Sequence, residues 1–203
     1  MSSTDLDQDA DDRDRDVPTY VHKTSLIGAP LVLRLKTEGL AYDGGRVSGV
    51  VPYERIKKVR LSFRPVTMQT QRYLTEVWAD GSPKLRIAST TWRSLMELAR
   101  QDAPYNAFVI ELHRRLAAAG SRAEFITGMP RLRFALGAVV FIASVVAFGA
   151  MVVHALSQGD TSGAALVGGF FLLFIWQVGT YLLRNRPGAY RPDAVPPGAL
   201  PPG

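Results

Sequence analysis

The densest positive charge in the sequence lies in a run of ten residues, 55–64. Five of them are basic: Arg55, Lys57, Lys58, Arg60 and Arg64. Alternate side chains of a β-strand point to opposite faces, so Lys58, Arg60 and Arg64 would form a basic stripe on one face. Such a stripe could bind a protein partner or anionic lipid headgroups, since each basic side chain near an anionic membrane contributes about 1 kcal/mol. A solvated outer strand face without a ligand explains the same pattern.

Residue types that perform catalysis or bind metals form no recognisable motif. The sequence has no cysteine, which excludes thiol nucleophiles and thiolate metal sites. Its three histidines are far apart: His22, His113 and His154. We therefore expect no catalytic residue, no metal and no cofactor. The alternative is a subunit of an envelope enzyme or transporter that acts on a membrane substrate, with one of three residues in the chemistry: His154, Glu54 or Glu97.

The basic run belongs to a segment, residues 20–122, whose pattern predicts a β-rich domain with one helix. Short runs with apolar alternation, separated by Gly-rich turns, predict seven strands at 31–36, 40–42, 46–51, 55–63, 72–79, 84–88 and 93–100. The helix follows, with Asp102 as its expected N-cap and Gly120 as its stop. Its apolar side chains recur at helical spacing, while His113 lies beside two arginines and is expected to be solvated.

Two uncharged apolar windows follow the domain. We expect transmembrane helices at 134–156 and 163–183, since about 20 apolar residues span the hydrocarbon of a bilayer. The six residues between them, 157–162, contain no Lys or Arg and predict a tight outer loop. Basic residues flank the other ends of the two windows: Arg131, Arg133, Arg184 and Arg186. Because cytoplasmic flanks carry the positive excess, both termini are expected in the cytoplasm.

The remaining segments are expected to be linkers or tails. Residues 1–16 contain seven aspartates and two arginines and so have a net charge of −5. Since the whole chain has a net charge of +6, the remaining residues have a net charge of +11. Residues 1–19 predict a disordered acidic tail in place of a signal peptide. Residues 123–133 predict a basic linker, and residues 184–203 a disordered Pro-rich tail.

Three runs of the sequence resemble a known type of domain. The runs Glu38–Tyr42, Val51–Val59 and Tyr105–His113 are similar to bacterial PH-like (pleckstrin-homology-like) domains of small membrane proteins. The resemblance covers residues 31–120 and implies an all-β split barrel of about seven strands capped by one C-terminal helix. It also implies a binding scaffold without catalytic residues. The loop Thr37–Gly39 lacks the basic residues that phosphoinositide-binding PH domains carry there, which argues against that ligand.

Together these patterns predict a protein of the bacterial inner membrane. A two-helix transmembrane hairpin would anchor a PH-like domain that faces the cytosol as a non-catalytic binding or scaffold module. Its expected partners are the lipid bilayer, anionic lipid headgroups and an unidentified membrane protein. Nucleic acid is not expected, because the basic stripe lacks interleaved aromatic residues.

Overall fold

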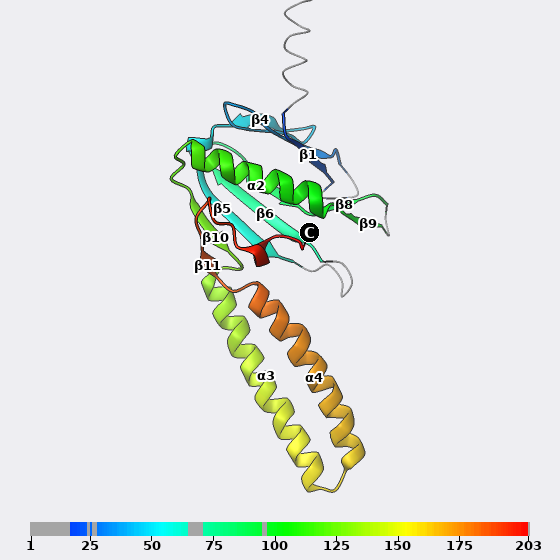
Figure 1. Cartoon of the computed structure of the whole chain (residues 1–203). Coiled ribbons are helices and arrows are strands. Elements are labelled where there is room, and N and C mark those ends of the chain that lie inside the picture. The colour runs from blue at the N-terminus through cyan, green and yellow to red at the C-terminus, as the bar shows by residue number, and fades with distance from the viewer. Residues whose placement is uncertain (1–16, 24, 26–27, 65–70, 95–96, 203) are drawn as a thin grey trace, which may run out of the picture. The chain divides into compact units, whose positions relative to one another are not determined.

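The computed structural model describes residues 17–23, 25, 28–64, 71–94 and 97–202. The expected acidic tail up to residue 16 lies outside the described residues. The chain divides into two compact units (Figure 1). The β-domain comprises the described residues up to 126 together with 189–202, and the helical hairpin comprises 127–188. The hairpin is therefore an insertion in the β-domain sequence.

The described strands of the β-domain form three sheets and no closed barrel. The first sheet is antiparallel and follows chain order: β1 (Thr19–His22), β2 (Leu31–Leu35), β3 (Leu40–Asp43) and β4 (Ser48–Val51). The second sheet has the order β11-β10-β5-β6-β7, with β5 at Ile56–Phe63, β6 at Tyr73–Ala79, β7 at Leu85–Ala88, β10 at Glu124–Thr127 and β11 at Gly188–Ala189. The third is the small hairpin of β8 (Thr90–Trp92) and β9 (Leu98–Arg100).

Six of the seven expected strands are present as β2 to β7, with ends shifted by one or two residues. The single strand expected at 93–100 is wrong. The backbone N–H of Arg93 donates to the carbonyl of Glu97, and the chain reverses between β8 and β9. The expected basic linker at 123–133 is also wrong in part, because residues 124–127 pair as β10.

The outer edge of β7 is covered by side chains of β1 instead of by another strand. The hydroxyl of Tyr20 donates to the carbonyl of Ala88 at 2.6 Å, and Nε2 of His22 donates to the carbonyl of Arg86 at 3.0 Å. Unpaired strand edges promote aggregation unless something covers them. These two bonds cover the edge and join the first sheet to the second.

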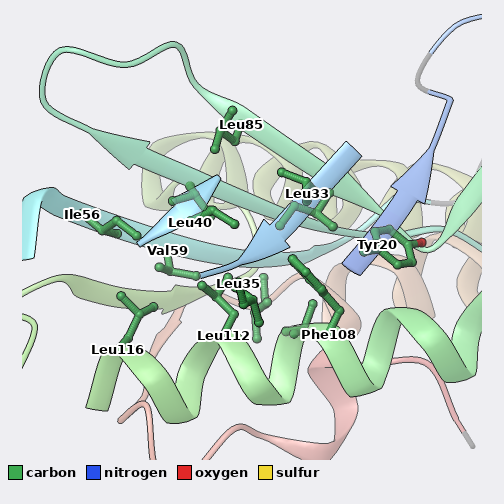
Figure 2. Close-up of a cluster of buried hydrophobic side chains, with 14 of the residues drawn as sticks. Tyr20, Leu33, Leu35, Leu40, Ile56, Val59, Leu85, Phe108, Leu112 and Leu116 are labelled. Atoms are coloured by element: carbon green, nitrogen blue, oxygen red, sulfur yellow. The ribbon is translucent and has the colours of Figure 1, made fainter. Parts of the chain in front are cut away.

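The helix α2 (Asp102–Ala118) packs against the inner faces of both sheets, as Figure 2 shows. Its Leu112 and Leu116 are fully buried in the core cluster that also contains Leu35 of β2. Burying each such leucine stabilises the fold by roughly 1.5–3 kcal/mol. The helix is confirmed, but Asp102 is its first residue instead of its N-cap and accepts a hydrogen bond from Nε of Arg100 at 2.7 Å.

The C-terminal segment differs from the expected disordered tail over 184–203. From Ala189 to Pro201 it lies along the β-domain, where Tyr190, Val195 and Leu200 pack against the core. The amide of Asn106 in α2 donates to the carbonyl of Pro201 at 3.0 Å. The apolar side chains bury enough surface to order the segment, and its prolines have less backbone entropy to lose.

His113 is a second correction, because it is buried and not solvated. Its Nδ1 donates to the carbonyl of Val109 at 2.7 Å, so the neutral ring accepts at Nε2 from the hydroxyl of Tyr190 at 2.8 Å. Phe125 of β10 completes an aromatic cluster with these two rings. The C-terminal segment is thus held on α2 by a partly buried hydrogen bond.

The helical hairpin consists of α3 (Arg131–Ser157) and α4 (Thr161–Arg184), which run side by side in Figure 1. Both helices are long and apolar enough to cross a membrane, and few of their residues are buried. Phenylalanine rings make the contact between them, such as Phe141 on Phe174 at 5.6 Å. Asp160 begins α4 by accepting a hydrogen bond from the backbone N–H of Gly163 at 2.8 Å. The tight turn that we expected between the windows is present.

Candidate anion-binding face

The outer face of the second sheet carries a cluster of charged side chains. Cross-strand register places Arg60 of β5 opposite Glu76 of β6, and Glu76 opposite Arg86 of β7. The inner faces of the same strands supply the core residues Val59, Leu61 and Val77. The period of two along each strand therefore directs the charges outward and the apolar groups inward.

Glu76 lies at the centre of this face, and its side chain is only 1 % exposed. Nζ of Lys84 is 2.5 Å from one carboxylate oxygen, and Nε of Arg86 is 3.8 Å from the same oxygen. The other oxygen lies 3.6 Å from Nη1 of Arg60 and 3.8 Å from Nη2 of Arg64. We call these five residues the Glu76 cluster. Four cations and one carboxylate give it a net charge of +3.

Trp78 extends the Glu76 cluster toward the β6–β7 turn. The guanidinium of Arg60 lies 5.0 Å from the centre of its ring, and Nζ of Lys84 lies 4.3 Å from it. Cations over an indole face are attracted by its quadrupole. The ring and the carboxylate together hold the two cations in place, so they need little further ordering to bind an anion.

The structure divides the basic stripe predicted from the sequence. Lys58, Arg60 and Arg64 are on the outer face as expected, but Lys58 pairs with Glu124 at 2.8 Å. Lys57 lies at a β-bulge and pairs with Asp80 at 2.9 Å. Arg55 is exposed in the turn before β5. Of the five basic residues predicted to form the stripe, only Arg60 and Arg64 therefore belong to the Glu76 cluster, in which cations outnumber acids.

Sequence reasoning missed the partners Glu76, Lys84 and Arg86. They lie on the β6–β7 hairpin, whose two strands were predicted at 72–79 and 84–88 with a turn between them. Extending the pairing outward from that turn would have placed Glu76 opposite Arg86, which is the signal that could have found them. Their association with Arg60 also requires the β5–β6 register, and the bulge in β5 hides that register from a simple count.

Lys84 and Arg86 also line a groove of about 380 Å³ between the β3–β4 turn and the β6–β7 turn. Its other walls are mostly apolar and include Leu31, Tyr42 and Val47. Basic side chains beside an apolar groove suit a ligand with an anionic head and an apolar body.

The other residues singled out from the sequence lie elsewhere. Arg131, Arg133, Arg184 and Arg186 are exposed and gather at the end of the helical hairpin where α3 begins and α4 ends. His154 is exposed in the last turn of α3. Glu54 and Glu97 lie on separate elements, and Glu97 pairs with Arg93 at 3.6 Å. Within the described residues no group of His, Asp or Glu side chains is placed to hold a metal ion.

Burial changes the protonation of two histidines of the β-domain, His22 and His113. Burial lowers the pKa of His22 to about 4 and lowers the pKa of His113 as well, so both rings are neutral near pH 7. Neither contributes positive charge to the outer face.

Compared with known proteins, the chain matches no family model, no curated protein and no solved structure.

Proposed function

We propose that this protein is a membrane-anchored, non-catalytic binding module whose Glu76 cluster binds the anionic surface of a membrane. The observation that carries the proposal is the convergence of four cations on one buried carboxylate. The carboxylate fixes the positions of the cations and neutralises only one of their charges. An anionic surface would meet an excess of three positive charges that is already arranged.

The electrostatics favour a weak, salt-sensitive interaction. Each basic side chain held near an anionic bilayer contributes about 1 kcal/mol, and the attraction falls off within about 8 Å at physiological ionic strength. Three excess charges alone would give a weak surface contact. Anchoring by the helical hairpin makes such a contact effective, because a tethered domain meets the surface at a high local concentration.

The proposal includes a place in the cell. We infer that α3 and α4 cross the bacterial inner membrane as a hairpin, with both termini in the cytoplasm. The support is the charge asymmetry of the hairpin, which has four arginines at one end and Asp160 in the turn at the other. A reporter fused after the last residue should be active only in the cytoplasm, and external activity would refute this orientation.

We further propose that the β-domain is a PH-like fold. The support is the succession of a four-stranded antiparallel sheet, then the strands β5 to β7, and then α2. PH-like domains are binding scaffolds, so this fold agrees with a non-catalytic role.

The alternative occupant of the basic face is an acidic surface of a membrane protein.

The test uses the full chain in nanodiscs. We compare discs of neutral phosphatidylcholine with discs that also contain phosphatidylglycerol, and measure hydrogen exchange in β5 to β7 at low and high salt. We expect the anionic lipid to increase protection of β6 and β7 at low salt. Charge reversal of Lys84 and Arg86 to glutamate should abolish the effect, whereas Arg34→Glu in β2 with Arg46→Glu in the β3–β4 turn should preserve it.

Equal protection in neutral and anionic discs would overturn the lipid proposal. Crosslinking in native membranes through the Glu76 cluster would then identify the alternative. An acidic membrane protein crosslinked there, and lost in the Lys84→Glu and Arg86→Glu variant, would replace the lipid as the partner.

A further inference from the structure

A second basic feature lies beyond the Glu76 cluster, where β5 ends and β6 begins. A cavity of about 120 Å³ is lined there by four basic side chains, from Lys23, Arg64, Arg72 and Arg86. Thr90 and Trp92 of β8 also line it, and Leu74 and Ala88 supply apolar contacts. We call this cavity the basic pocket. None of the residues that line it is acidic.

The backbone holds these cations together although they are distant in sequence. The N–H of Arg64 donates to the carbonyl of Arg72 at 2.7 Å and closes the base of the β5–β6 connection. The backbone N–H of Lys23 donates to Oγ1 of Thr91 at 2.9 Å, and the N–H of Trp92 donates to the carbonyl of Lys23 at 3.4 Å. The pocket is therefore built by β1, β5, β6, β7 and β8.

Arg72 is a member of the basic pocket whose charge has no acidic partner among the described residues. Nε of its guanidinium is buried and donates to no acceptor among the described residues, and the side chain forms no ion pair with them. Burial lowers the pKa of Arg72, and the nearby charge of Arg64 lowers it further. Arg64 and Arg86 also belong to the Glu76 cluster, but their nearest nitrogens lie 3.8 Å from the Glu76 carboxylate, which is longer than a hydrogen bond. Like charges are thus gathered with little compensation.

We propose that the basic pocket binds a phosphomonoester group. Four cations exceed what one carboxylate of charge −1 can neutralise, whereas a phosphomonoester carries −1.5 to −2 near pH 7 and three acceptor oxygens. Guanidinium forks suit such oxygens in bidentate geometry. The small volume accommodates the phosphate group itself, and the apolar contacts of Leu74 and Ala88 strengthen the attraction by lowering the local dielectric.

This inference rests on the proposed function, because it names the chemical group that the basic side of the β-domain recognises. The phosphomonoester has two sources. It can be the headgroup of a lipid such as phosphatidic acid, or a soluble phosphate ester. The charge and the oxygen geometry are the same for both, so the source is decided by experiment.

The experiment is isothermal titration calorimetry of the full chain in neutral nanodiscs, with glycerol 3-phosphate as the soluble probe. Arg72→Gln should weaken binding about tenfold or more, as expected for the loss of a charge-assisted hydrogen bond. Arg93→Gln, which removes an equal charge on the exposed β8–β9 hairpin, should leave binding within about twofold, as for other surface substitutions. Lys23→Gln is a second pocket variant with an exposed side chain, so it should fold normally and also weaken binding.

The lipid arm uses nanodiscs that contain phosphatidic acid or, at equal surface charge, phosphatidylglycerol. Protection of Arg72 and Thr90 amides from hydrogen exchange by phosphatidic acid, lost in Arg72→Gln, would support the headgroup as the source. Binding of glycerol 3-phosphate with the same dependence on Arg72 would support a soluble ester.

The outcomes separate this inference from the proposed function. If neither phosphatidic acid nor glycerol 3-phosphate acts through Arg72 and Lys23, the phosphomonoester site is refuted. Salt-sensitive protection of β6 and β7 by phosphatidylglycerol would still support the proposed function in that case. If the pocket binds phosphate while phosphatidylglycerol has no effect, only the proposed membrane-surface contact fails.

Discussion

Replacing Glu76 by glutamine should destabilise the β-domain. The substitution keeps the shape of the side chain and removes the carboxylate that four cations share. Removing one partner of a buried ion pair typically costs about 3–5 kcal/mol, because the remaining charge is left uncompensated. Here Lys84, Arg64 and Arg86 are 32 %, 45 % and 62 % exposed and can regain water. We therefore expect a smaller loss of about 2–3 kcal/mol, most of it from Arg60.

The assay is thermal unfolding of the full chain in neutral nanodiscs, followed by near-ultraviolet circular dichroism. For a domain of this size the expected loss lowers the unfolding midpoint by about 8–12 °C. Added phosphate should restore part of the loss, because an anion can bind the partly exposed cations Lys84, Arg64 and Arg86 and compensate their charge. Glu54→Gln is the matched control, since Glu54 is exposed and has no ion pair among the described residues, and it should change stability by no more than about 0.5 kcal/mol.

The reasoning would be refuted if Glu76→Gln were as stable as the parent at low ionic strength. That result would mean that mutual repulsion of the four cations is already relieved by water, so the carboxylate would not be what holds them. A more stable variant would point the same way, since the desolvation of Glu76 would then outweigh its attraction to the cations.

Three other perturbations test the fold. Folding lowers the pKa of His22 from 6.5 to about 4, so the unfolded chain takes up a proton before the folded one does. The free energy of unfolding should therefore have its highest value above pH 6.5 and should fall by about 3 kcal/mol as the pH is lowered to 4. His22→Phe should flatten most of that fall in urea titrations. Tyr190→Phe leaves Nε2 of His113 without its donor, so it should cost about 1–2 kcal/mol and speed hydrogen exchange in the C-terminal segment, whereas unchanged exchange would contradict the bond. Gly128 has a φ of +72°, and an added Cβ would collide with the backbone at the end of α4. Gly128→Ala should therefore weaken the hydrogen bond from the Met129 amide to the carbonyl of Asn185 and lower the protection of that amide from hydrogen exchange. Equal protection would argue against this contact.

The parts of the fold that could be predicted from the sequence are those defined by local patterns. The alternation in β2, the helical spacing of Leu112 and Leu116, and the two apolar windows each reflect contacts made within one element or with its neighbour. Strand β1 has no such signal, because Tyr20 and His22 find their partners on β7, more than 60 residues away. The four-residue strand also follows an acidic run, which made its surroundings look disordered.

The candidate site shows the same division. The outward direction of Arg60 and Arg64 follows from the period of β5 alone. Their partner Glu76 and the additional cation Arg86 depend on two strand registers, and the position of Arg72 depends on its backbone pairing with Arg64 where β5 ends and β6 begins. A linear count of charge overstated the stripe for the same reason, because it could not include Asp80 and Glu124, which pair with its other lysines.

The position of the helical hairpin in the sequence determines when the β-domain can be completed. The chain leaves the second sheet at β10 and returns at β11, so Phe125 and Tyr190 meet only after both apolar helices have been made. A fragment that ends before α3 lacks Tyr190, which leaves Nε2 of His113 unsatisfied and one edge of β10 unpaired. A soluble form of the β-domain should therefore join residue 127 to residue 188 through a short flexible linker, because that connection retains Tyr190 and both paired strands, β10 and β11.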